Sequence, residues 1–209
     1  MNIHNIYAPI AKHFRTKRMR EFVSIFRVGD RTSIIDVGGT EFNWQLIDKQ
    51  PRVLLVNFDD EEWEKDRLRK IKGDGRHLEI ADNSFDIAYS NSVIEHVGGW
   101  EDQVAFSKEI RRVAPNYYVQ TPNARFFIEP HLLAPFLHFL PRNTQRRLVR
   151  YFSVWGLVTR PSQAEVDAFI DSIRLLTKEN MQQLFPDAVI IEEKVLGLTK
   201  SLIAMRVTI

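Results

Sequence analysis

The sequence predicts an α/β protein built on a doubly wound, mostly parallel sheet. Three observations lead to that class. Short apolar runs alternate with helix-like stretches as far as residue 123, which is typical of strand–helix–strand chains. A pair of glycines directly follows the first apolar run. The chain closes with two strand-like segments, at about 188–195 and 200–207, joined by a short turn that predicts an antiparallel pair.

The first elements are predicted from spacing and from turn residues. Residues 8–27 are expected to form an amphipathic leading helix, because Phe22 and Phe26 share an apolar face with basic residues opposite. The apolar run 33–37 ends at two glycines, which predicts a buried strand followed by a tight turn. Residues 41–48 are expected to form a short helix.

The next segment contains a second strand, a charged stretch and a weak third strand. The run 52–58 (RVLLVNF) predicts a buried strand. Residues 59–70 begin with acidic and end with basic side chains, the order that a helix dipole favours, so a helix is expected there. Residues 70–72 are expected to form a third strand that ends at Gly73 and Gly75.

The parallel part of the sheet is completed by two further strands around a helix. Residues 84–90 (SFDIAYS) predict the fourth strand and residues 116–120 the fifth. Between them, residues 101–113 are expected to be helical, because Phe106 and Ile110 fall on one face.

The strand–helix alternation stops at residues 124–170, which are expected to form a helical lid. Four prolines interrupt this segment, and it is rich in Phe, Leu and Arg. It has six arginines before residue 161, against Glu129 as its one acid. A helix beginning at Thr177 and the closing strand pair complete a C-terminal part, residues 174–209.

Length and composition predict one globular domain over residues 1–209. The hydrophobic fraction is 44% and the charged fraction 27%. The chain has no cysteine, which excludes a disulfide scaffold, a zinc–thiolate site, an iron–sulfur site and a cysteine nucleophile. The net charge of +2 gives no reason to expect a nucleic-acid partner.

Nothing in the sequence predicts a membrane span or a secretory signal. The longest apolar stretch, 132–140, is interrupted by Pro135 and His138 and falls far short of the ~20 residues that a span needs. The apolar run 6–11 precedes a basic cluster, which is the reverse of the order in a signal peptide. A cytoplasmic protein is therefore expected.

The most informative motif is Asp36-Val37-Gly38-Gly39, directly after the first strand. Glycines at this point let the backbone turn sharply and let a ligand approach the main chain. A nicotinamide-binding fingerprint would carry three glycines followed by an acid, whereas here the acid comes first and the third glycine is missing. Taken alone, the motif also fits a plain strand–turn–helix unit.

Three segments at intervals of about 20 residues carry a family resemblance. In order they are IIDVGGT, RVLLVNFDD and GDGRHLEIADNSFDIAYSNSVIEHVG. The ordered set resembles the class I S-adenosylmethionine-dependent methyltransferases, in particular the type 11 group. The resemblance is strong over residues 30–123 and looser over 174–207. It implies a three-layer Rossmann-like sheet with strand order 3-2-1-4-5-7-6, the last strand antiparallel.

The resemblance also implies a cofactor, S-adenosylmethionine, and residues that bind it. Asp36 and Gly38 would flank the methionyl moiety, with Gly39 lining the turn. Asn57 would stand at the ribose. Asp74 would accept a hydrogen bond from the adenine amino group, with the Gly75 amide close to the ring, and Asn91 and Ser92 would face the cofactor near its sulfonium. The chain departs from the family pattern at Thr40, which replaces a glycine, and at Asn57, which replaces an acid.

Two histidines are candidates for catalysis. His96 follows the fourth strand, where cofactor and acceptor meet in the resembled family, and His131 lies at the start of the lid beside Glu129. Each also has a structural interpretation: His96 would support its loop, with Glu95 capping a helix, and His131 would pack in a turn. No metal site is expected from the spacing alone.

The predicted reaction is transfer of a methyl group to an oxygen or nitrogen of a small-molecule acceptor beneath the lid. The alternative is a non-catalytic Rossmann-like module that binds a partner or a membrane surface through its basic, aromatic lid. The sequence leaves the acceptor and the oligomeric state open.

Overall fold

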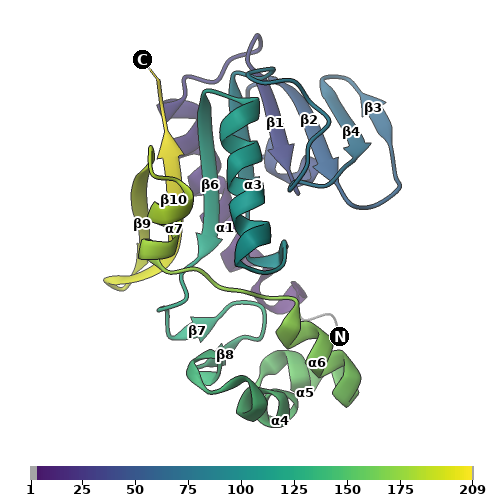
Figure 1. Cartoon of the computed structure of the whole chain (residues 1–209), viewed down its shortest axis with the longest axis vertical. Helices are drawn as coiled ribbons and strands as arrows, with labels where there is room; N and C mark the ends of the chain where they lie inside the picture. The colour runs from purple at the N-terminus through teal and green to yellow at the C-terminus, as the bar shows by residue number, and fades with distance from the viewer. Residues whose placement is uncertain (1–3, 209) are drawn as a thin grey trace.

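A central sheet of eight strands organises the computed structural model, which describes the backbone of residues 4–208 and the side chains of residues 12 and 14–208. The strands of this sheet are β1 (Ser33–Val37), β2 (Arg52–Asn57), β3 (Trp63–Lys65), β4 (Leu68–Lys72), β5 (Ile87–Asn91), β6 (Asn116–Pro122), β9 (Val189–Val195) and β10 (Leu198–Arg206). The order across the sheet is β3-β4-β2-β1-β5-β6-β10-β9 (Figure 1).

This order confirms the predicted fold class. The five strands β4, β2, β1, β5 and β6 are parallel, and β10 lies antiparallel between β6 and β9. Numbered as the sequence predicts them, the seven expected strands are arranged 3-2-1-4-5-7-6. The structure adds β3, which pairs antiparallel with β4 at one edge.

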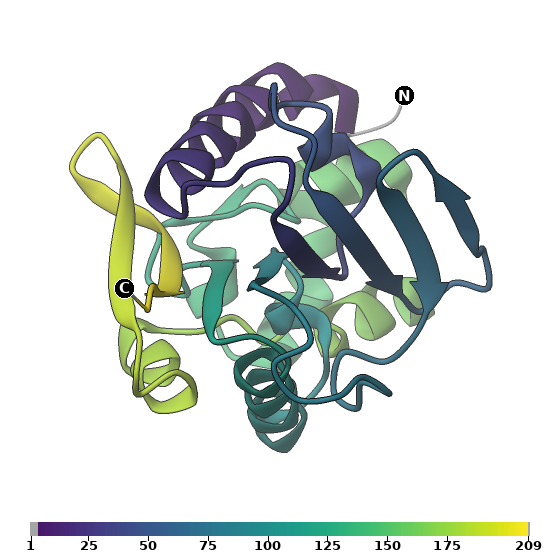
Figure 2. The same ribbon diagram turned by 90° about the horizontal axis from the view of Figure 1, so that it is seen from above.

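Helices cover the two faces of the sheet, which gives three layers (Figure 2). On one face lie α1 (His4–Ile25) and the short α2 (Glu41–Trp44). On the other face lie α3 (Trp100–Val113) and α7 (Lys178–Leu184). Phe22 of α1 and Phe106 of α3 are both fully buried in the two core clusters that these layers form. Burial of such side chains is the main source of stability for the sandwich.

The helix expected over residues 59–70 is wrong: this segment is a hairpin that contains β3 and most of β4. Lys70 forms ion pairs with Asp59 and Glu61, and Lys72 pairs with Asp60. The acidic-then-basic order therefore places opposite charges across a hairpin instead of at the two ends of a helix. All five residues of β4 also pair with β2, which provides sheet partners for its backbone.

The helix expected over residues 41–48 is shorter than predicted, because α2 ends at Trp44. The amide of Leu46 bonds to the carbonyl of Asn43, three residues back, which tightens the chain into a turn. The other expected elements are found with ends shifted by a few residues, and Thr177 is the N-cap of α7.

The lid lies beyond the carboxyl ends of the parallel strands, on the side to which the arrowheads of β1, β2 and β6 point (Figure 1). It is not purely helical, because it opens with a two-stranded hairpin. Its elements are β7 (Ile128–Glu129), β8 (Ala134–Pro135), the short 3-10 helix η2 (Leu137–Phe139), α4 (Arg142–Phe152), α5 (Val154–Thr159) and α6 (Gln163–Asp171). It has a small core of its own, which includes Leu132, Val149 and Val166.

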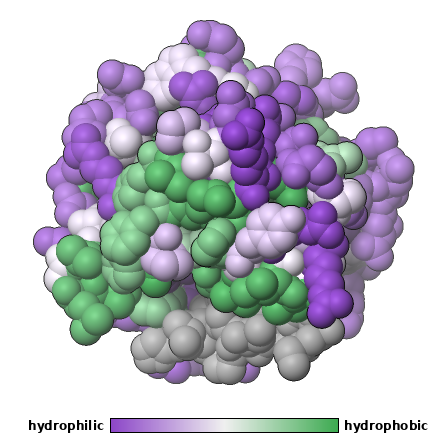
Figure 3. All heavy atoms as spheres, turned by 90° about the horizontal axis from the view of Figure 1, so that it is seen from below, coloured by the Kyte–Doolittle hydropathy of each residue, from purple (hydrophilic) through white to green (hydrophobic). Residues whose placement is uncertain are grey.

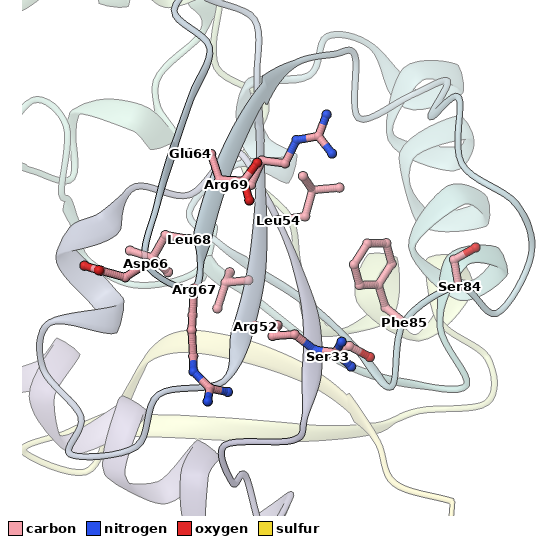
Figure 4. Close-up of a pocket in the computed structure, with 11 residues that line it drawn as sticks. Ser33, Arg52, Leu54, Glu64, Asp66, Arg67, Leu68, Arg69, Ser84 and Phe85 are labelled. Carbon is pink, nitrogen blue, oxygen red and sulfur yellow. The ribbon is translucent and has the colours of Figure 1, made fainter.

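Among residues 4–208, no helix covers the part of the sheet around β2 and β4 on the face that α3 covers elsewhere (Figure 2). A cavity of about 640 Å³ lies there, beside the amino-terminal halves of β2 and β4. Leu54, Arg69 and Phe85 are among the residues that line it (Figure 4). Ligands in open α/β sheets bind at the opposite, carboxyl ends of the strands, and none of the predicted site residues lines this cavity.

In the described part of the chain, no helix is both long enough and apolar enough to cross a membrane.

Candidate active site

Gly38 forms the turn at the carboxyl end of β1. Its φ of +79° lies in the left-handed region that favours glycine. Its amide donates to the carbonyl of Val56, at the end of β2. A Cβ atom at this position would collide with the side chain of Val93, which follows β5. The turn is therefore held by the ends of both neighbouring strands and admits no larger residue without rearrangement.

Asp36 supports this turn from within the protein. Its side chain is fully buried, and one carboxylate oxygen accepts a hydrogen bond from the Trp44 indole at 2.9 Å. The other oxygen has no hydrogen-bond partner among the described residues. Burial raises the pKa of Asp36 to about 7, against the opposing effect of the Trp44 bond. A Cβ atom at Gly39 would overlap the same carboxylate. Asp36 thus packs beneath the turn.

Asn57 and Asp74 lie at the ends of the next two strands. The Asn57 amide donates to the carbonyl of Gly39 at 2.6 Å, which leaves its own oxygen available to accept a bond from a ribose hydroxyl. Asp74 receives a two-pronged bond from Arg76, and Arg76 also pairs with Asp102. The Arg76 hydrogen bonds lower the pKa of Asp74. Because each carboxylate oxygen can accept more than one bond, Asp74 can still accept from an adenine amino group.

A cavity of about 420 Å³ lies beside the end of β2. Its volume is within the size range of small-molecule sites. Gly39, Thr40 and Asn57 line it. Asp74, Gly75, Asn91 and Ser92 do not. Gly75 is close-packed, since a Cβ there would meet Val37 and Phe106. The cavity accordingly brings together the motif turn and the ribose position, but not the adenine and sulfonium positions.

Asn91 and Ser92 end β5, next to the motif turn. The Asn91 oxygen accepts a hydrogen bond from Arg18 of α1 at 2.6 Å. Ser92 has a φ of +57° and donates its hydroxyl to the side chain of Gln120 at 3.0 Å. Arg18 is only 6% exposed, although the sequence suggests a solvated basic face for this helix. Sequence reasoning missed its contact, because nothing in the local pattern distinguishes Arg18 from the other basic residues of α1.

The structure brings the two candidate histidines into direct contact. His96 lies in the turn η1 (Ile94–His96), after β5, and His131 lies in the lid. Their Nε2 atoms are 3.1 Å apart, and the two rings are nearly perpendicular. The Nδ1 atom of His131 is 2.5 Å from a carboxylate oxygen of Glu129, whose other oxygen accepts from the Leu132 amide. A chain of three side chains thus connects the lid to the carboxyl end of β5.

Glu95 lies beneath this chain and is fully buried. One of its oxygens accepts a hydrogen bond from Thr121 at 2.9 Å, so it does not cap a helix as one interpretation of the sequence suggests. Its other oxygen has no partner among the described residues. Burial raises the pKa of Glu95 to about 7.

The two imidazoles have pKa values displaced in opposite directions. Burial and the neighbouring His131 lower the pKa of His96 to about 4. Burial also works against a charge on His131, but the hydrogen bond and the charge of Glu129 outweigh it and raise that pKa. Opposed shifts in contacting groups are typical of functional sites.

Glu129 also lines a cavity of about 340 Å³ within the lid. His138, Arg142 and Arg174 contribute polar groups to it, among apolar side chains of the lid core. Both ring nitrogens of His138 are buried without a hydrogen-bond partner in the described part of the chain. The cavity has room for a small molecule next to Glu129, which contacts His131.

Comparison with known proteins agrees with this geometry. Residues 36–116 match the family described as methyltransferase domain. The match begins at Asp36 and ends at the start of β6, so it covers the motif turn and the ends of the strands that follow it. No curated protein sequence matches the chain.

Solved structures show the same fold at low sequence identity. A protein from Pyrococcus horikoshii has a TM-score of 0.57 at 17% identity, with 94% of this chain and 89% of that one covered. A putative Zn-dependent alcohol dehydrogenase from Rhodobacter sphaeroides has a TM-score of 0.59 at 11% identity, with 91% and 96% covered. A SAM-dependent methyltransferase from Methanosarcina mazei has a TM-score of 0.50 at 15% identity, with 88% and 94% covered.

Two further methyltransferase structures are longer: the chain spans 45% and 59% of their lengths. The glycine turn with its tight neighbours, the free acceptor on Asn57 and the adjoining cavity fit the cofactor of the matched family. Residues 36–116 therefore match a methyltransferase domain, and that family implies S-adenosylmethionine as the cofactor.

Proposed function

We propose that this protein transfers the methyl group of S-adenosylmethionine to an oxygen or nitrogen atom of a small-molecule acceptor bound beneath the lid. The observation that carries the proposal is the position of the His96–His131–Glu129 chain. It lies beside the end of β5, the strand that also carries Asn91 and Ser92. The lid therefore supplies side chains at the edge where the motif residues gather.

Residues 30–123 bind the cofactor in this proposal. Gly38 and Gly39 give the methionyl moiety access to the main chain, and Asp36 holds that turn from below. Asn57 accepts from the ribose, Asp74 and Gly75 meet the adenine, and Asn91 with Ser92 lies near the sulfonium. When bound, the cofactor supplies an electrophilic methyl group, so the protein's main contribution is to position the acceptor and exclude water.

Residues 124–170 cover the acceptor. Its nucleophilic atom meets His131 and His96, and the remainder of the molecule occupies the cavity beside Glu129. Glu129 holds the His131 ring by its Nδ1 atom, which turns Nε2 toward the acceptor side. Glu129 and His131 are thus placed to orient the nucleophile and to take its proton.

Calorimetry with S-adenosylmethionine tests the cofactor half of this proposal. Binding with one site per chain supports it, and the absence of binding overturns it. Formation of S-adenosylhomocysteine on addition of candidate hydroxyl- or amine-bearing acceptors tests the transfer itself. The complete lack of cysteine fits a cytoplasmic enzyme, and fractionation of the source cells tests that location.

One surface feature favours contact of the lid with a membrane as a second role. Large apolar side chains are exposed on the lid, and the molecule seen from below has apolar patches on this side (Figure 3). Among them, Tyr151 and Phe152 end α4, where no described acid pairs with the exposed Arg147 or Arg150. Sedimentation with anionic vesicles tests this role: Phe152→Ser should weaken binding, whereas Val189→Ser, an exposed residue on the far strand β9, should not.

A further inference from the structure

The cluster formed by Glu95, His96 and His131 has the composition of a metal site. Each of the three residues offers one ligand atom, and these atoms all lie within 4.8 Å of one another. Two imidazoles and one carboxylate are a ligand set found in catalytic zinc sites, where a fourth position stays open for water or substrate.

The spacing of the two imidazole nitrogens fits a shared ion. With metal–nitrogen bonds of about 2.0–2.1 Å, two ligands of a tetrahedral site lie about 3.3 Å apart. The Nε2 atoms of His96 and His131 are 3.1 Å apart and their rings are nearly perpendicular. Both nitrogens can therefore face one ion with little movement of either ring.

Glu129 has the position of a supporting residue for such a ligand. A histidine that binds a metal through one nitrogen usually donates the other N–H to a carboxylate or a carbonyl. The Nδ1 atom of His131 is 2.5 Å from Glu129, which is itself fixed by the Leu132 amide. This arrangement selects the tautomer in which Nε2 carries no proton, so its lone pair can bind a metal in place of the contact with His96.

The charge balance gives an independent reason to expect a cation. Glu95 and Glu129 are both buried. Glu129 pairs with His131, whereas no described lysine or arginine forms an ion pair with Glu95. One oxygen of Glu95 is buried without any hydrogen-bond partner in the described part of the chain, and the cluster is the place where its carboxylate meets both imidazoles. A buried carboxylate oxygen without a partner is costly, and a divalent ion at this point would satisfy it.

We propose that Glu95, His96 and His131 bind one Zn²⁺ ion, and that its open position binds a hydroxyl group of the acceptor. This inference rests on the proposed function and narrows the acceptor to one with an oxygen nucleophile. The bound hydroxyl loses its proton to water more readily, because the ion stabilises the alkoxide. The methyl group then forms a bond to that oxygen as its bond to the cofactor sulfur breaks, and S-adenosylhomocysteine leaves. The two histidines hold the ion in this scheme instead of taking the proton themselves.

Metal binding is tested on the full chain after treatment with a chelator and dialysis. Titration with Zn²⁺ should give one tight site per chain, and Co²⁺ should give the intense visible absorption of a tetrahedral site. His96→Ala and His131→Ala should abolish that absorption. Glu129→Gln should weaken binding by about 10–100-fold, as loss of a supporting carboxylate does. His77→Ala, which removes an exposed histidine outside the cluster, should change neither result.

The outcomes separate this inference from the proposed function. If the wild-type chain binds no stoichiometric metal, or if the double variant His96→Ala/His131→Ala binds it equally well, the zinc site is overturned. Methyl transfer that persists in chelator at full rate overturns the zinc site and leaves the proposed function standing. A chain that binds Zn²⁺ through these residues but does not bind S-adenosylmethionine overturns the proposed function instead.

Discussion

Two regions border the candidate site: the cofactor edge, where the strand ends carry Gly38, Asn57, Asp74 and Asn91, and the lid, residues 124–170. Different kinds of contact hold them in position. At the cofactor edge the strand ends are fixed by the sheet, and Asn57 bonds to the carbonyl of Gly39 after the neighbouring strand. The catalytic candidates are instead fixed by one another, through the contacts from His96 of η1 to His131 of the lid and from His131 to Glu129. In the proposed function, the strand ends therefore determine where the cofactor binds, and the separate small core of the lid determines where the acceptor binds.

The largest effect is expected at the cofactor edge. Gly38→Val should abolish binding of S-adenosylmethionine, because the new side chain combines a left-handed backbone with a collision against Val93. Gly197→Val is a matched control, since Gly197 has a φ of +80° but open space around it. Calorimetry on both variants, with circular dichroism to check the fold, separates backbone strain from loss of the site. Normal binding by Gly38→Val would make the turn purely structural.

A lid variant should produce the opposite pattern, with loss of turnover and unchanged cofactor binding. His131→Ala should lower the rate by about 10²–10⁴-fold, since it removes the imidazole that meets the acceptor. The cofactor affinity should stay the same, because no cofactor-edge residue touches His131 in the structure. Steady-state kinetics measures the turnover rate, and calorimetry measures the affinity for S-adenosylmethionine. Wild-type turnover on the true acceptor would remove His131 from the mechanism.

The buried acid of the cofactor edge should make stability depend on pH. The pKa of Asp36 is raised from 3.8 to about 7, so the folded state keeps a proton that the unfolded state has lost over this interval. The contribution of Asp36 to the free energy of unfolding is greatest below about pH 4. It is lost as the pH rises to about 7, a change of about 4 kcal/mol. Urea titrations at several pH values should show a flatter profile for Asp36→Asn than for the wild type. Parallel stability profiles for Asp36→Asn and the wild type would show that Asp36 does not cause the pH dependence.

The smallest expected effect concerns the adenine position. Asp74→Ala should weaken cofactor binding by about 1–3 kcal/mol, the cost of losing a hydrogen bond to a buried group. Asp102→Asn is the control, because Asp102 also pairs with Arg76 but lies outside the predicted cofactor contacts. Equal losses in the two variants would show that Asp74 acts only by holding Arg76, and an unchanged affinity in Asp74→Ala would exclude the adenine contact.

The parts of the site that are formed by residues close together in the sequence could be predicted from it. The strand at 33–37 and its glycines are local signals, and the order of the parallel strands follows from the family resemblance. Residues 59–70 were mispredicted because their charge order fits both a helix and a hairpin, and only pairing with β2 decides between them. The contact of His96 with His131 joins residues that are 35 positions apart, so spacing alone could not predict it.

Arg18 has a consequence for how the protein is made. Its guanidinium contacts Asn91 on β5 and Glu193 on β9, which emerge from the ribosome long after α1. A growing chain that has completed β5 still lacks the carboxylate that holds Arg18 from the other side. The first helix therefore docks fully only when nearly all of the chain has been synthesised, and contacts of such long sequence separation slow folding.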